Sequence, residues 1–591
     1  MATSPPLFPP EALREYGFLA DGERGAVIGP RGELVWMCAP RWDSDAVFSA
    51  LLGGGGQYVV TPADRWFVWG GHYEPGSLVW RSRWVTSEGA IECRDALAMP
   101  ADPHRAVVLR RLDGVDRGAD VRLLLDVGAG FGRRGLRDLK IDDDGVWTAR
   151  AGDLYVRWTG ASDARVVDGH LEAVLALPLG RSHDLVLEIS DQPLSREAPA
   201  EPGRQWEETE NAWRRRVPTL HTAVAQRDAR HAYAVLTGLT SASGGMVAAA
   251  TTSLPERAEA GRDYDYRYSW IRDQCYAGRA VAATGACELL DSALGFVSER
   301  LHEDGPELRP AYTVAGGHVP SIREVKELTG YPGGGRVVGN RIDAQFQLDV
   351  FGEALLLLAA GARNDRLDAS HWRAAEIAVD AVRKRHDDAG AGLWELGTRR
   401  WAHSRLSCAA GLRAIAAEAP APQAAEWVSL ADHLVASTTE DCLHPSGRWQ
   451  RAPDDERIDA SLLLSAVRGA VPADDPRSRA TLEAVRSDLV ADDFVYRFRH
   501  DARPLHDAEG AFLLCGFVAA LAMHQVGETV TARAYFERAR SACGPAGLYS
   551  EEYDVVQRQL RGNLPQAFVH ALMLECAVRL GRPWTDEHTT P

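Results

Sequence analysis

The sequence predicts two structural parts: an antiparallel β-sandwich over residues 1–195 and a large all-α domain over residues 226–591. Three observations support this prediction. The chain has 591 residues, more than a single domain usually contains. Short runs rich in Val, Leu and Trp, separated by Gly, Asp, Asn or Pro, fill the stretch from residue 16 to about residue 195. Beyond residue 226 the apolar residues recur at helical spacing.

The first part is expected to consist of strands joined by tight turns. The segment Asp142–Gly145, DDDG, is typical of the turn of a β-hairpin. Many strands at such short spacing favour two antiparallel layers. The expected strands cover residues 24–28, 33–38, 57–60, 78–85, 106–111, 120–126, 155–159 and 184–189.

A linker that contains one helix is expected over residues 196–225. Ser195–Arg204 is rich in Pro and Gly, and the polar segment Gln205–Arg216 after it predicts a bridging helix that Pro218 ends. The periodicity of the remaining chain predicts helices but does not by itself show a closed barrel. These helices are expected at 227–239, 268–283, 285–301, 341–362, 371–386, 402–418, 423–440, 458–470, 477–489, 509–526, 530–542 and 564–580.

Composition argues against several classes of protein. The chain has 66 Lys and Arg against 83 Asp and Glu, a formal net charge of −17, which disfavours nucleic acid and anionic membranes as partners. No apolar stretch approaches the roughly 20 residues that cross a bilayer. The first residues show no basic region before an apolar run. Nine Cys are too few for a disulfide framework, so we expect a cytoplasmic protein.

Four polar clusters lie between the expected helices, and the first is Thr251–Asp273. Aromatic faces stack on sugar rings, and a neighbouring Arg and Asp can bind sugar hydroxyls. Taken alone, the pattern fits better a helix start with an aromatic core face and a surface ion pair. Six residues of this cluster lie within ten positions: Tyr264, Tyr266, Tyr268, Trp270, Arg272 and Asp273.

The second cluster, Ile322–Gln347, contains the glycine run Gly333–Gly335. No GK[ST] follows this run, so it is not a phosphate-binding P-loop. Either it lets a loop approach a ligand closely or it forms a turn.

The third cluster, Gly390–Arg399, places Trp394 beside Glu395. An aromatic wall partly desolvates a carboxyl group and raises its pKa, as a general acid requires near neutral pH. For an isolated Trp-Glu pair, a helix end with an exposed Glu is far more common.

The fourth cluster, Gly547–Gln566, contains the adjacent Glu551 and Glu552. Two neighbouring carboxylates repel each other, so we expect one to face a pocket and the other to face solvent. An ionised carboxylate in a pocket could deprotonate water. The alternative is a solvated acidic turn.

Other chemistries lack their motifs. The sequence contains no HExxH and no paired CxxC, so we expect no metal site and no cofactor. Gly180–Asp184, GRSHD, does not complete the G-x-S-x-G motif of a nucleophilic serine.

Together the four clusters resemble glycoside hydrolase family 15, the glucoamylase family, which includes bacterial and archaeal trehalases, glucodextranases and isomaltose-cleaving enzymes. The matching segments keep one order over more than 500 residues. They are Tyr16–Leu52, TTSLPE at Thr251–Glu256, DYRYSWIRD at Asp265–Asp273, GNRIDAQFQLDVFGE at Gly339–Glu353, GLWE at Gly392–Glu395, SEEYD at Ser550–Asp554 and GNLPQAFVH at Gly562–His570.

The resemblance implies a fold and a pair of catalytic residues. The family fold is an N-terminal β-supersandwich, a helical linker and an (α/α)6 barrel. In the family, the Glu of GLWE is the general acid and the first Glu of S-E-x-x-D is the general base. These positions are Glu395 and Glu551 in this sequence.

The resemblance also implies substrate-binding residues. Arg272 and Asp273 match the pair that binds the terminal glucose, and Tyr266 matches the tyrosine that supports the catalytic water. Trp270 matches an aromatic residue of the pocket wall. The same motifs make Trp394 and Glu552 expected pocket contacts, and Arg497 in VYRF matches a substrate-binding arginine.

Three segments depart from the family pattern. The sequence reads GYPGGGRVVGN at Gly330–Asn340, one residue shorter than usual and without the Pro of the PV pair, GLWELGTRR at Gly392–Arg400 in place of GLWE-x-R, and HSR at His403–Arg405 where HSK or SSK is common. All three are expected near the leaving-group sugar, so linkage and leaving group stay open.

The implied function is an inverting exo-acting hydrolase that releases β-glucose from a short α-gluco-oligosaccharide or disaccharide. Inverting enzymes place their two carboxyls roughly 6.5–9.5 Å apart, which leaves room for a water. An α,α-trehalase is the alternative within this chemistry. An inverting disaccharide phosphorylase and an inert sugar-binding protein are alternatives of other classes, and assembly into a homo-oligomer stays open.

Overall fold

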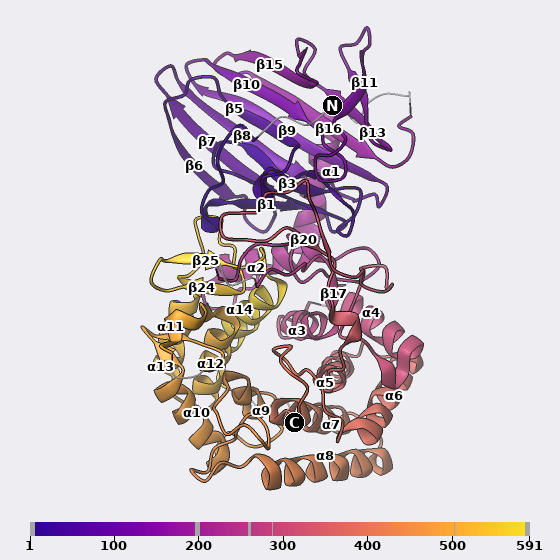
Figure 1. The fold of residues 1–591 in the computed structure, drawn as a ribbon, viewed down its shortest axis with the longest axis vertical. Coiled ribbons are helices and arrows are strands. Elements are labelled where there is room, and N and C mark those ends of the chain that lie inside the picture. Colours follow the sequence, from indigo (N-terminus) through magenta and orange to yellow (C-terminus); the bar gives the residue numbers. More distant parts are fainter. Residues whose placement is uncertain (1–5, 196–200, 258–261, 287, 501–502, 585–591) are drawn as a thin grey trace.

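The computed structural model describes residues 6–195, 201–257, 262–286, 288–500 and 503–584. It consists of a β-part, formed by two antiparallel sheets, and a helical part that follows it in the chain (Figure 1). The fold class predicted from the sequence is therefore confirmed.

The first sheet has eight strands in the order β1-β2-β3-β5-β10-β15-β14, with β4 paired to β3. All of its pairings are antiparallel. The strands are β1 (Gly17–Ala20), β2 (Gly25–Ile28), β3 (Glu33–Cys38), β4 (Ala46–Phe48), β5 (Gln57–Pro62), β10 (Ala119–Asp126), β14 (Arg165–Val167) and β15 (His170–Leu177).

The second sheet also has eight strands, in the order β11-β12-β13-β16-β9-β8-β7-β6. The predicted hairpin turn at Asp142–Gly145 joins β11 to β12, with Ile141 opposite Trp147. The strands are β6 (Phe67–Tyr73), β7 (Trp80–Thr86), β8 (Ala90–Leu97), β9 (Arg105–Asp116), β11 (Leu136–Ile141), β12 (Trp147–Ala151), β13 (Leu154–Thr159) and β16 (Ser182–Ser190).

A single helix, α1 (Pro202–Arg216), connects the two parts. Proline suits the first turn of a helix because its missing N–H needs no partner there, and the Glu201 side chain accepts hydrogen bonds from the next two free amides. Trp206 and Trp213 are buried, and α1 contacts β9, β16 and α2 (Gln226–Leu239). The helix begins three residues before the predicted start. The domain limits at 195 and 226 stay a prediction.

Six inner helices of the second part form a closed ring. Each contacts the next in the order α3-α5-α7-α9-α12-α14, and α14 contacts α3 again. They are almost wholly buried because helices cover them from outside. Their bounds are α3 (Ile271–Ala282), α5 (Asp349–Arg363), α7 (Ala402–Ala416), α9 (Leu464–Val467), α12 (Leu513–Gln525) and α14 (Ala567–Arg579).

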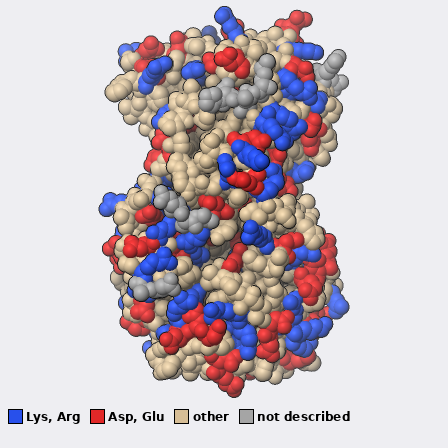
Figure 2. Space-filling view, viewed as in Figure 1, with Lys and Arg blue, Asp and Glu red and all other residues tan. Residues whose placement is uncertain are grey.

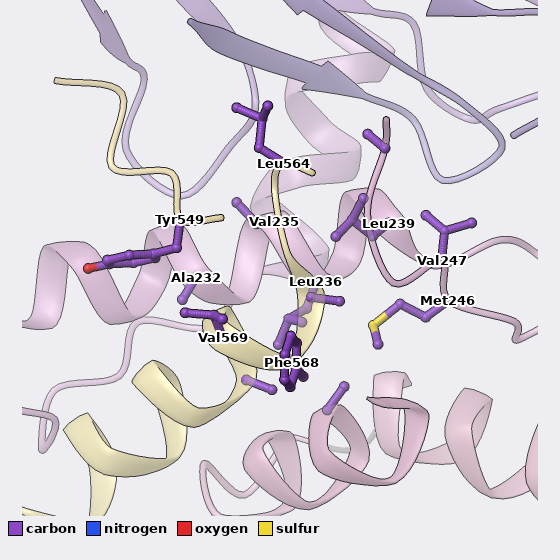
Figure 3. Packing of buried hydrophobic residues seen from close by; sticks show 14 of the residues in the cluster. Ala232, Val235, Leu236, Leu239, Met246, Val247, Tyr549, Leu564, Phe568 and Val569 are labelled. Atoms are coloured by element: carbon purple, nitrogen blue, oxygen red, sulfur yellow. The ribbon is translucent and has the colours of Figure 1, made fainter. Parts of the chain in front are cut away.

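The outer helices are amphipathic, and each covers the ring from outside. In Figure 3, side chains of α2 such as Val235 and Leu236 meet Phe568 and Val569 of α14. This alternation of inner and outer helices is the arrangement of an (α/α)6 barrel. The other outer helices are α4 (Glu288–Asp304), α6 (Ala369–Arg385), α8 (Ala421–Cys442), α10 (Pro476–Asp488) and α13 (Thr529–Arg540), and a short α11 (Leu505–Ala508) precedes α12.

Several predicted helices begin later than expected. The segments before α3 and α12 form two-residue strands, β17 (Ser269–Trp270) and β23 (Ala511–Phe512), and a short turn of 3-10 helix, Ile342–Ala344, precedes α5. The region predicted as a helix over 458–470 contains only a 3-10 turn and the four-residue α9. Apolar residues in these segments are buried by long-range contacts, which imitates helical periodicity in the sequence.

The surface carries both signs of charge. In the view of Figure 2, acidic and basic side chains alternate over both parts of the molecule. Within the described ranges, every helix is too short or too polar to traverse a lipid bilayer. The eight cysteines in those ranges are all free thiols.

Candidate active site

A cavity of about 790 Å³ opens where the inner helices begin. Its walls come from the segments that lead into α3, α5, α7, α12 and α14, together with the first turn of α3. The predicted site residues that line it are Tyr266, Trp270, Arg272, Asp273, Trp394, Glu395, Arg497 and Glu551. Side chains that are far apart in the sequence therefore meet in one cavity.

Glu395 lies in a tight turn before α7. Gly390 and Arg399 pair at the base of this loop, and Gly392 has a φ of 70° against the ring of Trp401, where a Cβ would lie 2.6 Å from the ring. Glu395 itself is left-handed, with a φ of 54°. Its side chain is 26% exposed, so it is accessible from the cavity.

The carboxylate of Glu395 is held by groups from the start of α3. The indole N–H of Trp270 donates a hydrogen bond to Oε1 over 2.9 Å, and Nη2 of Arg272 lies 3.9 Å from the same oxygen. The neighbouring Trp394, which the sequence suggested as the desolvating wall, donates its N–H to Asp459 instead. Trp394 still lines the cavity, but Trp270 is the aromatic residue that binds the carboxylate.

Glu551 is a buried carboxyl group in the segment that leads into α14. The Tyr266 hydroxyl lies 3.1 Å from its Oε2, and its backbone carbonyl accepts a hydrogen bond from Leu513 at the start of α12. Burial raises the pKa of Glu551 to about 7. Glu551 can therefore exchange a proton near neutral pH.

Two aromatic side chains connect the carboxyl groups. Tyr266 contacts Glu551 and Trp270 contacts Glu395, and the two rings meet edge to face with centroids 5.5 Å apart. Because both rings come from one short segment, that segment fixes both carboxyl groups in relation to each other.

Arg272 and Asp273, in the first turn of α3, place two charged groups in the cavity wall. Nη1 of Arg272 donates to Gln347 over 3.0 Å, and its Nε has no hydrogen-bond partner among the described residues. Burial raises the pKa of Asp273 to about 6, although the nearby Arg272 guanidinium opposes the shift. An unpaired donor beside a buried carboxyl group can bind a ligand hydroxyl.

Arg497 is a buried cation in the cavity wall. It donates to Glu509 over 2.6 Å and lies over the rings of Trp394 and Phe512, at 5.6 and 4.6 Å from their centroids. Its nearby guanidinium helps to lower the pKa of Glu509 to about 2, although burial acts the other way. Arg497 therefore lies against a permanently ionised partner.

Glu552 does not line the cavity, contrary to the sequence expectation. It is fully buried, accepts a hydrogen bond from the Gly510 amide over 2.8 Å and lies 3.4 Å from Nη2 of Arg497. The reason is the strand β24 (Glu552–Asp554), which pairs with β23, because consecutive side chains of a strand point to opposite faces. Of the adjacent pair, Glu551 faces the cavity and Glu552 supports Arg497 from behind.

The segments that depart from the family pattern differ in their place relative to the cavity. Gly330–Asn340 contributes Gly339 and Asn340 to the lining and Gly392–Arg400 contributes Leu396, whereas none of His403–Arg405 lies in it. The glycine run Gly333–Gly335 forms a turn, with Gly334 packed close to Ser253 and Pro255. That these segments lie beside the leaving-group sugar stays a prediction.

The sequence analysis missed Glu256 as a site residue. Its carboxyl group lines the cavity and lies 3.2 Å from the Tyr266 hydroxyl. Glu256 is the last residue of the TTSLPE motif, so its position in a matching segment was the available signal.

Two family models match the chain. The model "Glycosyl hydrolases family 15" matches residues 229–578, and the model "Trehalase-like, N-terminal" matches residues 10–206. The first covers the helical ring, and the second covers the β-part and the first five residues of the connecting helix α1.

Similar proteins and structures agree with these models. The chain is 28% identical to a trehalase of Mycobacterium tuberculosis, over 98% of this chain and 92% of the relative, and 29% identical to one of Mycolicibacterium smegmatis, over 97% and 92%. It is 26% identical to trehalase 1 of Sulfolobus acidocaldarius, over 95% and 98%. A bacterial glucoamylase solved with acarbose has the same fold, with a TM-score of 0.70 and 13% identity over 99% of this chain and 97% of that chain.

Proposed function

Because the chain belongs to glycosyl hydrolase family 15 and is thus a glycoside hydrolase, we propose that it hydrolyses α,α-trehalose with inversion at the attacked anomeric carbon. The observation that carries the proposal is that Glu395 and Glu551 line one cavity, each held by an aromatic side chain of the same segment.

The proposed reaction divides acid and base work between the two carboxyl groups. Glu395 gives its proton to the glycosidic oxygen as the bond between this oxygen and the anomeric carbon breaks. Glu551 takes a proton from a water whose oxygen forms the new bond to the same carbon. Attack from the face opposite the leaving group inverts the configuration. Glu395 then regains a proton from solvent and Glu551 loses one.

The proposed glucose site is the part of the cavity beside Arg272 and Asp273. Arg272 and Asp273 would bind hydroxyls of the glucose that is attacked, and Tyr266 would orient the attacking water beside Glu551. Trp270, Trp394 and Arg497 would form the wall around the ring. Binding of the terminal sugar by Arg272 and Asp273 would leave no room for a continuing chain, so the proposed action is on chain ends.

The relatives support trehalose over the longer gluco-oligosaccharides of our first expectation. The curated relatives that match nearly the whole chain are trehalases, and a trehalase-like model matches the β-part. The glucoamylase likeness supports the fold alone, at 13% identity. A phosphorylase would bind phosphate in place of the base, and a carboxyl group at position 551 disfavours it. The free cysteines in the described ranges support the proposed cytoplasmic location.

A substrate panel with matched variants tests the proposal. Trehalose, maltose, isomaltose, nigerose and kojibiose are compared, each with and without phosphate, and trehalose is expected to give the highest kcat/KM. Glu395→Gln and Glu551→Ala should each lose about 10²–10⁴-fold in kcat, the usual contribution of a general acid or base. Glu88→Gln, an exposed carboxyl group in the β-part, is the control and should keep wild-type turnover.

Two outcomes would contradict the proposal. A variant of Glu395 or Glu551 that keeps more than a tenth of wild-type kcat would move that role to another residue. Faster hydrolysis of maltose than of trehalose would return the substrate to the gluco-oligosaccharides. Turnover that requires phosphate and yields a sugar phosphate would establish a phosphorylase.

A further inference from the structure

A third carboxyl group, that of Glu256, stands beside Glu551 in the cavity wall. Both side chains are buried, with exposed fractions of 4% for Glu256 and 8% for Glu551. A Cβ placed on Gly562 would lie 3.5 Å from Cγ of Glu256 and 3.6 Å from Cβ of Glu551, so both side chains leave the backbone within one small region.

The Tyr266 hydroxyl lies between the two carboxyl groups. It is 3.2 Å from Oε1 of Glu256 and 3.1 Å from Oε2 of Glu551. A phenol has one proton, so it can donate to only one carboxylate at a time. The other carboxyl group must bring its own proton, which it can donate to the phenol oxygen or directly to its partner.

We propose that Glu256 is a positioning residue that holds one proton against Glu551, so that Glu551 is the ionised member of the pair and its carboxylate is fixed by two hydrogen bonds. The proposal rests on the assignment of Glu551 as general base. It adds a third carboxyl group to the two that the proposed reaction needs.

The electrostatics decide which member keeps the proton. Two buried carboxyl groups in contact do not both ionise, because the second charge would face the first in a poorly solvated site. Burial raises the pKa of Glu256 well above its ordinary range, and the charge of Glu551 raises it further. Burial raises the pKa of Glu551 only to about 7, because a hydrogen bond from Glu256, the charge of Arg497 and a hydrogen bond from Tyr266 oppose the shift.

The charged groups around Glu256 and Glu551 do not reverse the order of the two pKa values. The titratable and charged groups that face Glu256 are Glu551, Glu552, Tyr264, Tyr266, Arg262 and Arg497. Both arginines are bound to Glu509, over 3.3 Å from Arg262 and 2.6 Å from Arg497. Both arginines lower the pKa of Glu256, but burial and the charge of Glu551 outweigh them, so the pair at neutral pH carries one negative charge.

The pH dependence of kcat/KM tests the proposal in three variants. In Glu256→Gln the amide N–H still donates to Glu551, so the midpoint of the acid limb should stay within about 0.3 pH unit of wild type. In Glu256→Ala this donor is lost, the ionised form of Glu551 is less stable, and the midpoint should move up by about 1 pH unit. Asp263→Ala removes another carboxyl group of the cavity wall and should leave the midpoint unchanged.

A merely structural role predicts a different pattern. It would lower kcat or stability in Glu256→Ala and leave the acid limb in place, and that result would overturn the proposal. A Gln variant that shifts the limb as far as the Ala variant would overturn it too, because the donated hydrogen bond would then be irrelevant.

Infrared spectroscopy provides a readout that needs neither activity nor the Ala variant. The difference spectrum of wild type minus Glu256→Gln at pH 7 should contain the band of a protonated carboxyl group. A carboxylate band in its place would overturn the proposal. If Glu551→Ala stays active, the assignment of the base fails, whereas the infrared result still decides where the proton lies.

Discussion

Glu395 combines a partly exposed side chain with a left-handed backbone, a conformation that is uncommon for residues other than glycine, asparagine and aspartate. A left-handed conformation costs a residue with a Cβ about 1–2 kcal/mol. The sharp turn directs the side chain toward Trp270 and into the cavity. Local strain of this kind is often found where a side chain must be held for a reaction.

Replacing Glu395 with glycine should therefore separate stability from activity. We expect the free energy of unfolding of Glu395→Gly to exceed that of Glu395→Gln by about 0.5–1 kcal/mol. Glycine adopts a φ of 54° without strain, and this gain is larger than the extra chain entropy that glycine loses on folding. Both variants should be inactive on trehalose. Thermal unfolding followed by circular dichroism measures the difference, and a Gly variant no more stable than the Gln variant would show that the turn is unstrained.

At the scale of single residues, the sequence identified the two carboxyl groups of the proposed reaction and several of their aromatic and charged neighbours, but not the contacts between them. Glu395 and Glu551 were found because each lies in a short motif. That Trp270, and not Trp394, binds Glu395 depends on how the start of α3 faces a loop more than a hundred residues later. Glu256 was missed because a single Glu after a proline carries no local sign of its partner.

At the scale of elements, the segment before α3 contacts the carboxyl groups of Glu395 and Glu551 and is itself hydrogen-bonded to the β-part. Arg267 donates to Asp265 over 2.7 Å and to the backbone carbonyl of Ser44 over 2.8 Å. Asp265 in turn accepts a hydrogen bond from the Gly339 amide. Asp265 and Arg267 flank Tyr266 in the sequence, so their buried ion pair fixes the position of the Tyr266 side chain that contacts Glu551.

Removing the interactions of Arg267 should reduce both the free energy of unfolding and kcat. Arg267→Met leaves Asp265 buried without its partner, which typically costs about 3–5 kcal/mol. We also expect kcat to fall at least tenfold, because Tyr266 loses its fixed position. Chemical denaturation and steady-state kinetics measure the two effects. The control is Arg204→Met, whose solvent-exposed ion pair with Glu208 should contribute little to stability.

An Arg267→Met variant with wild-type kcat would show that the β-part stabilises the cavity without orienting Tyr266. No pattern in the sequence indicates this contact, since two of the three acceptors of Arg267 in the β-part are backbone carbonyls. Such acceptors are present at every residue and leave no pattern.

At the scale of the whole molecule, the change from strand to helical periodicity was enough to predict the two-part fold. Closure of the ring was not readable from periodicity, because it depends on α14 meeting α3 across almost the full length of the helical part. The family resemblance supplied that closure. The β-part contributes no residue to the cavity wall, yet its Trp36 donates to the carbonyl of Ala250, next to the segment that carries Glu256.

The central claim is that Glu395 and Glu551 act from opposite sides of one anomeric carbon of trehalose. Proton NMR of the first products, recorded before mutarotation, tests it most directly. Inversion predicts equal amounts of β-glucose from the attacked sugar and α-glucose from the leaving sugar. Formation of α-glucose alone would show retention and contradict the account.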